Sequence, residues 1–188
     1  MKKIYLIVAL AFMSSSLKAQ LNGQLTITGS WNVTVPADVS IEEAGTNYQP
    51  IESASNQALV SWSTSTLLGV STCELNYTNY TVFVSKENNA IELNDGNDFK
   101  IFVRRTNVGQ DPTALLTPLL PKTPPFGGVS YLEAKANVAT EFFRFQGCRE
   151  NIPIQFKLDA SVLTPVNSYY PDVVFTIVDE SILAFLGL

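Results

Sequence analysis

The sequence predicts an all-β protein built as a two-layer antiparallel β-sandwich. Apolar and polar residues alternate with period two in many short segments, helical periodicity is weak, and clusters of Gly, Pro, Asn and Asp separate the segments. The chain has 188 residues, of which 46% are apolar and 15% charged. This composition suits one folded domain with a substantial core.

Residues 1–19 predict a secretory signal peptide. Lys2 and Lys3 form a short positive region, residues 4–13 are all apolar, and small and polar residues lead to Ala19. The apolar run is shorter than the roughly 20 residues of a transmembrane helix, and no later segment is long enough to be one. We therefore expect cleavage after Ala19 and export across the inner membrane, to the periplasm, the outer surface or the medium.

Residues 20–180 form the predicted sandwich domain. Residues 21–35 carry an apolar residue or glycine at every odd position, as in a strand with one buried face. Later segments rich in Val, Ile, Phe, Tyr and Thr predict further strands at 58–68, 80–84, 99–103, 142–145, 152–158 and 173–178. Residues 132–139 fit either a strand or one helical turn. The alternation predicts a core that includes Trp31, Val33, Val82, Val84, Ile101, Val103, Ile154, Phe156, Phe175 and Ile177.

Two segments interrupt this strand pattern. Residues 109–128 contain five prolines and no clean alternation, which predicts a long surface loop between two strands. Residues 181–188 form an apolar, uncharged C-terminal tail, which we expect to be packed or bound because an exposed apolar tail promotes aggregation.

Composition excludes several kinds of function. The chain has no histidine, which removes histidine-based acid–base catalysis, Ser–His triads and His-ligated zinc. The net charge of −5 makes nucleic acid an unfavourable partner. Arg104 and Arg105, the one basic pair at a strand end, are interpreted as surface ion-pair residues.

Cys73 and Cys148 are the only two cysteines. An exported chain meets an oxidising compartment, so we expect them to form a disulfide. The alternative is two buried, unpaired cysteines that serve packing.

Three weaker patterns leave other functions open. Trp62, Tyr77, Tyr169 and Tyr170 are aromatics that could face a ligand, such as a glycan, as in a carbohydrate-binding module. A pair of carboxylates could support a hydrolase, although no acidic pair has a distinctive spacing. Residues 94–98 hold oxygen ligands and a glycine but lack the later Glu of a calcium loop, so we interpret them as a turn. No metal or cofactor is expected.

Four segments carry a resemblance to a known group. They are residues 79–84 (NYTVFV), 99–106 (FKIFVRRT), 151–158 (NIPIQFKL) and 170–177 (YPDVVFTI). Their order resembles secreted bacterial β-sandwich proteins of the fimbrial-subunit and spore-coat type. The resemblance implies an immunoglobulin-like architecture and a surface or structural role, and it carries no catalytic residues. The chain departs from chaperone–usher subunits, because Phe175 stands where those subunits have a glycine.

Together these features predict a non-enzymatic structural or adhesive surface protein, similar to a fimbrial subunit. Its expected partners are other copies of itself or other surface proteins, joined by β-strand addition. Residues 20–35 could serve as the first strand of their own sheet or fill a groove in a neighbour. We expect the first of these, because the run continues through Trp31 without a linker. The tail is a second candidate donor.

The signal peptide gives a direct prediction. Intact-mass spectrometry of the exported protein should show a chain that begins at or near Gln20, because signal peptidase cleaves after small residues. Recovery of the uncleaved chain in a membrane fraction would identify the apolar run as an anchor instead.

Overall fold

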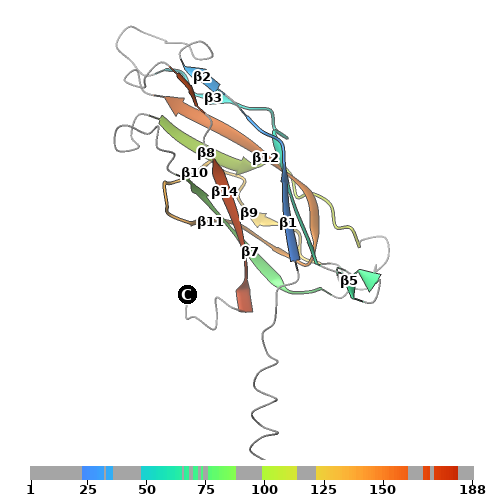
Figure 1. The fold of residues 1–188 in the computed structure, drawn as a ribbon. Helices are drawn as coiled ribbons and strands as arrows, with labels where there is room; N and C mark the ends of the chain where they lie inside the picture. The colour runs from blue at the N-terminus through green and yellow to red at the C-terminus, as the bar shows by residue number, and fades with distance from the viewer. Residues whose placement is uncertain are drawn as a thin grey trace, which may run out of the picture.

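The protein is an all-β sandwich, as the sequence predicted (Figure 1). The computed structural model describes residues 23–31, 33–35, 48–64, 66–67, 70–71, 73, 76–87, 99–113, 122–160, 167–169 and 172–181. The predicted signal peptide, the turn at residues 94–98 and all of the tail except Ser181 lie outside these residues. Every strand pairing in the described part is antiparallel.

The larger sheet has six strands and the smaller sheet has four. The larger sheet runs in the order β1 (Gly23–Thr28), β4 (Ala58–Thr64), β12 (Arg149–Ala160), β8 (Phe99–Arg105) and β10 (Leu132–Glu133), with β3 (Ile51–Glu52) paired to β12. The smaller sheet runs in the order β14 (Val173–Asp179), β7 (Asn79–Lys86), β11 (Thr140–Gln146) and β9 (Phe126–Gly127).

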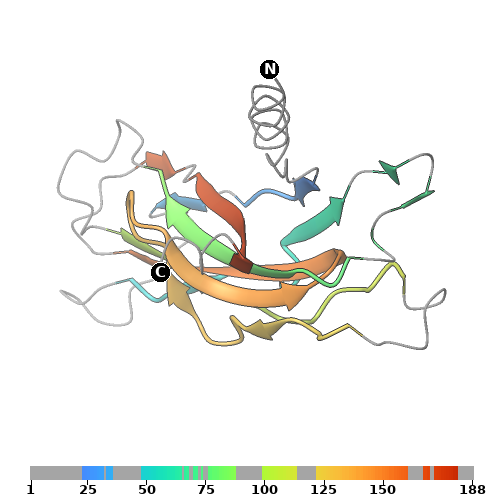
Figure 2. The same cartoon turned by 90° about the horizontal axis from the view of Figure 1, so that it is seen from below.

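Two short strand pairs lie at opposite ends of the sandwich (Figures 1 and 2). One end carries β2 (Val33–Val35) paired with β13 (Asn167–Tyr169). The other end carries β5 (Thr66–Leu67) paired with β6 (Val70–Ser71).

The core lies between the sheets and contains all ten residues that the alternation predicted. Val82, Val84, Val103 and Ile154 are completely buried. Trp31 and Ile177 are only partly buried but pack against the same cluster. Gly23 is required on β1 because a Cβ there would lie 2.2 Å from the Trp62 ring. The period-two pattern therefore selected the inward faces correctly.

One lateral side of the sandwich is closed by the chain itself. Between β9 in the smaller sheet and β10 in the larger sheet, the backbone crosses from one layer to the other. Arg105, at the end of β8, holds this crossing: its N–H donates to the Gly128 carbonyl, and its guanidinium donates to the carbonyls of Gly127, Pro125 and Asn107. Arg105 is buried, so its predicted surface role is wrong, whereas Arg104 does pair with Glu52 at 3.9 Å.

The segment at residues 109–128 differs from the predicted loop. Its described ends are attached to the sandwich: Gln110 forms a bridge to Glu150, Lys122 is buried, and residues 126–127 form β9. Residues 114–121 lie outside the described part. Of the two alternatives for residues 132–139, the strand is confirmed at its start, where Leu132 and Glu133 form β10.

The predicted disulfide joins Cys73 to Cys148, with Cα atoms 5.4 Å apart. Both cysteines are buried, and Thr64 Oγ1 lies 3.6 Å from each sulfur. The bond ties the loop after β6 to the turn between β11 and β12.

Removal of the disulfide should destabilise the fold strongly. The bond closes a loop across a sequence separation of 75, and loss of such a loop costs about 4 kcal/mol in the chain-entropy account. Urea unfolding of the Cys73→Ala/Cys148→Ala double variant should show this loss, and dithiothreitol should weaken the wild type but leave the double variant unchanged. Equal stability of the two proteins would contradict a structural role for the bond.

Candidate functional site

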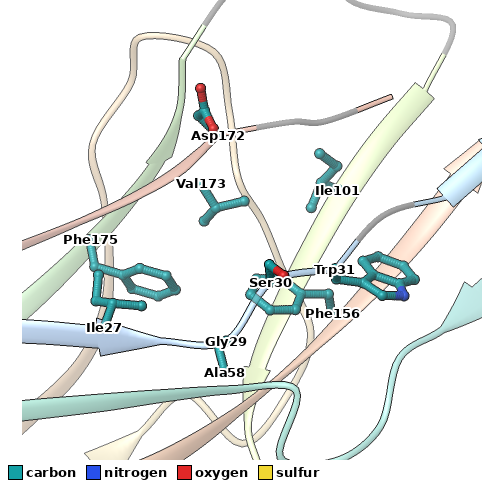
Figure 3. A pocket seen from close by; sticks show the side chains of 10 residues that line it. All are labelled: Ile27, Gly29, Ser30, Trp31, Ala58, Ile101, Phe156, Asp172, Val173 and Phe175. Atoms are coloured by element: carbon teal, nitrogen blue, oxygen red, sulfur yellow. The ribbon is translucent and has the colours of Figure 1, made fainter. Parts of the chain in front are cut away.

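The second lateral side of the sandwich is bounded by two edge strands, β1 of the larger sheet and β14 of the smaller sheet. We call this side the seam. A pocket of about 220 Å³ opens here between the two layers. In Figure 3, Ile27 from β1 and Phe175 from β14 appear at the same side of the pocket. The pocket is lined by residues of both sheets, namely Ile27, Ala58, Ile101, Phe156, Val173 and Phe175, and by Gly29, Ser30, Trp31 and Asp172.

Trp31 and Gly29 shape one wall of the pocket. Trp31 stacks on Phe156 with ring centroids 6.0 Å apart and an interplanar angle of 16°. Gly29 has φ +103°, and a Cβ there would lie 2.2 Å from the Gln57 carbonyl oxygen. Only glycine fits this left-handed position against β4. The turn after β1 is thus fixed, and it directs Trp31 onto the pocket wall.

Both strands that bound the seam lack the usual protection of sheet edges. Natural edge strands commonly carry charges, prolines or bulges that prevent pairing with another chain. The β1 sequence, GQLTIT, has no charge and no proline, and its Ile27 is 42% exposed. The β14 sequence, VVFTIVD, has no charge before Asp179 and pairs with β7 without a bulge.

The aromatics predicted to face a ligand do not form a platform in the described part of the chain. Trp62 is only 6% exposed and packs on Tyr80 with ring centroids 5.2 Å apart, so its predicted exposure is wrong. Trp62 lies on the inward parity of β4 with Ala58 and Val60, a signal that the prediction overlooked. Tyr77 is 37% exposed, with the Lys122 ammonium 5.7 Å from its ring centroid. The side chain of Tyr169, and Tyr170 as a whole, lie outside the described part.

A different pair of aromatics lies on the outer face of the larger sheet. The Arg104 guanidinium is 4.6 Å from the Tyr131 ring centroid, and the Lys157 ammonium is 4.4 Å from that of Phe102. Because cations already lie over both rings, these faces are not free to stack on a sugar.

A buried polar cluster near the disulfide was missed by the sequence reasoning. Asp111 lies 3.9 Å from both the Lys122 ammonium and the Arg149 guanidinium. Lys122 also donates to the Thr113 hydroxyl at 2.7 Å and to the Cys73 carbonyl. Arg149 donates to the Thr123 carbonyl at 2.8 Å. These contacts attach both ends of the proline-rich segment to the disulfide region. The spacing of these residues in the sequence does not indicate a cluster, because they come together only when the chain folds.

The environment of Asp111 favours its charged form. Burial raises the pKa of Asp111. Hydrogen bonds from Thr113 and the positive charges of Lys122 and Arg149 lower it by more, so the net shift of the pKa is downward. A carboxyl with a lowered pKa stabilises the fold above its ordinary pKa and loses this contribution as the pH falls.

Within the part of the chain that the structure describes, no group of three or more His, Cys, Asp or Glu side chains is arranged to hold a metal ion. No helix among the described residues is long and apolar enough to span a bilayer. Glu141 forms an exposed ion pair with Arg144 at 2.8 Å.

Comparison with protein-family models, with curated proteins and with solved structures finds no match to this chain.

Replacing Asp111 should weaken the fold at neutral pH. Asp111→Asn removes the one carboxylate that faces Lys122 and Arg149 in the described cluster, which should cost about 2 kcal/mol. The wild type should lose this contribution as the pH falls below the ordinary Asp pKa, so the two proteins should converge in acid. Urea unfolding at several pH values measures both effects. Glu141→Gln, which breaks an exposed pair, should change stability little; an equal loss in both variants would contradict the assignment.

Proposed function

We propose that this protein is a non-enzymatic structural subunit of an assembly outside the cytoplasm, in which copies join by β-strand addition at the seam. The observation that carries the proposal is the pair of long edge strands, β1 with no charge and β14 with none before Asp179, on either side of a pocket lined mostly by apolar residues. The resemblance to fimbrial-type sandwich proteins and the predicted signal peptide agree with this role.

The two lateral sides of the sandwich differ in a way that supports strand addition. On one side, the edges are the two-residue strands β9 and β10, which the backbone joins directly and Arg105 holds. On the seam, β1 and β14 are six and seven residues long. A long, uncharged edge exposes unpaired backbone groups that a strand from another chain can satisfy.

The pocket would supply specificity to this contact. In strand addition the main-chain hydrogen bonds provide affinity, and pockets for alternate side chains fix the register. A partner strand alongside β1 or β14 could place one large apolar side chain between Ile27 and Phe175. Ile27 and the pocket would then leave water together, which favours association.

In this proposal β1, the first strand of the chain, accepts a strand from a partner chain along its free edge. Residues 23–28 pair with β4 over six positions, from Gly23 opposite Thr64 to Thr28 opposite Leu59. This is the arrangement expected of an ordinary first strand.

A single charge at the seam should abolish association. Ile27→Lys introduces the kind of charge that protects natural edge strands, and Ile27 is exposed enough for the fold to tolerate it. Light scattering over a range of concentrations should show wild-type oligomers and a monomeric variant with an unchanged far-ultraviolet circular dichroism spectrum.

Val138→Lys is the matched control, since Val138 is also an exposed aliphatic residue but lies between β10 and β11, away from the seam. It should associate like the wild type. A wild type that remains monomeric at all concentrations, or equal loss of association in both variants, would refute the proposal.

A further inference from the structure

The lengths of the edge strands determine which parts of two copies can pair. Among the described strands with a free edge in the two large sheets, β3, β9 and β10 have two residues each, whereas β1 has six and β14 has seven. Very short edge strands are a usual protection against pairing. Copies that join through their described edges therefore use β1 and β14 on both sides, so that one seam meets another.

The two strands of the seam run in opposite directions past the pocket. In β1 the chain reaches the pocket at Ile27 and continues along it to Ser30, whereas β14 leaves the pocket after Phe175. Thr26 precedes Ile27 and Thr176 follows Phe175, so both threonines lie one position beyond the pocket in the same direction. Both are exposed. One line drawn across the two layers can therefore pass beside both threonines.

A twofold axis along this line pairs β1 antiparallel with its own copy in a favourable register. Thr26 then lies opposite the partner's Thr26, and Leu25 lies opposite the partner's Ile27. Leu25 and Ile27 are on the inward side of β1, because their neighbours on β4 face the core. Gln24 lies opposite the partner's Thr28 on the outward side. Apolar residues thus meet apolar residues, and polar residues meet polar residues, which stabilises a strand pair.

The same axis makes β14 self-complementary. Thr176 lies opposite the partner's Thr176. On the inward side Phe175 lies opposite the partner's Ile177, and on the outward side Val174 lies opposite the partner's Val178. The register of β14 with β7 fixes these sides, because Phe175 and Ile177 pair with core residues of β7. Both edges of the seam therefore fit a second copy about one axis.

Charge does not oppose this contact. Like charges directly opposite one another destabilise a strand pair, and Asp179 is the one charged residue in the two strands. It lies three positions from the axis, so the two copies of Asp179 are roughly 20 Å apart. Glu180 is directed onto the smaller sheet, where its carboxylate accepts a hydrogen bond from the Thr81 hydroxyl at 3.1 Å and lies 3.8 Å from the Arg144 guanidinium.

We infer that two copies of this protein form a closed dimer about a twofold axis through the seam, with β1 paired to β1 and β14 paired to β14. The inference rests on the proposed function, and it names the partner and the geometry of that same site. Both sheets continue into the second copy, and Ile27 is covered by the partner's Leu25. A contact that uses the same surface on both copies closes at two chains.

One other arrangement of two seams pairs β1 with β14 of the second copy. It keeps Thr26 opposite the partner's Thr176, but on the outward side it sets Val174 against the partner's Thr28 and Val178 against the partner's Gln24. Each apolar side chain there meets a polar one. The like-with-like pairs of the proposed dimer are more favourable.

Cysteine cross-linking of the full exported chain tests the dimer. Thr26→Cys and Thr176→Cys, each made alone with the native disulfide retained, place two cysteines opposite each other at the axis. Their Cα atoms would be about 4.5–5.5 Å apart, which is within the range of a disulfide. Mild oxidation should convert most of each variant to a covalent dimer on a non-reducing gel, and circular dichroism should show an unchanged fold.

Gln24→Cys is the matched control, because Gln24 is exposed on the same side of the same strand. Its two copies would lie four positions apart along the strands, roughly 14 Å, so it should give no more covalent dimer than the wild type. Light scattering of the wild type should reach a plateau at twice the mass of one chain as the concentration rises.

Three results would overturn the inference but leave association at the seam intact. They are a mass that rises beyond two chains, cross-linking of Gln24→Cys equal to that of Thr26→Cys, and a covalent dimer that forms only when the Thr26→Cys and Thr176→Cys proteins are mixed. The last result would identify the pairing of β1 with β14. Association at the seam is measured separately with Ile27→Lys, so the two failures are distinguishable. A wild type that stays monomeric would refute both proposals.

Discussion

The buried guanidinium of Arg105 holds the connection on which the shape of this sandwich depends. Burying a charged group is costly unless its donors are satisfied, and burial lowers the pKa of Arg105. Here the donors are used on three carbonyls of two loops, and the guanidinium carbon lies 5.9 Å from the Phe143 ring centroid. Consecutive left-handed glycines, Gly127 and Gly128, let the backbone pass close to Phe142 and Phe143. The crossing fixes one sheet against the other along one side, whereas the opposite side of the described sandwich is bounded by the edge strands β1 and β14.

Different interactions stabilise the two ends of the sandwich. At the end near β5 and β6, the disulfide and the Asp111 cluster anchor loops that have little regular structure of their own. At the other end, the pocket lies where β4 begins, at Ala58, and contains no ion pair among its described contacts. Covalent and charged links therefore stabilise one end, whereas the end that holds the pocket depends on apolar packing.

A sandwich that leaves two long edges unprotected is prone to pair with other chains. In a monomer this would be a defect, but in a subunit it is a means of assembly. The outer faces of the two sheets differ from the edges at the seam. The larger sheet covers its outward aromatics with Arg104 and Lys157, and the smaller sheet carries the Glu141–Arg144 ion pair on its outward side. Among the described residues, the seam combines two long edge strands with a pocket.

The sequence by itself determined the fold class, the inward faces of β7, β8, β12 and β14, and the pairing of the cysteines. These follow from period-two alternation and from having only two thiols in a predicted export product, which are local or compositional signals. It did not determine that Trp62 and Arg105 are buried, or that Asp111, Lys122 and Arg149 form a cluster. A charged residue at the end of a strand looks the same in sequence whether it meets water or buried carbonyls. The partners of the Arg105 guanidinium lie as many as 22 positions away, and Cys73 lies 49 positions from Lys122. The seam is likewise a tertiary property, because an edge strand is defined by the neighbour it lacks, and strand order is set only when the whole chain has folded.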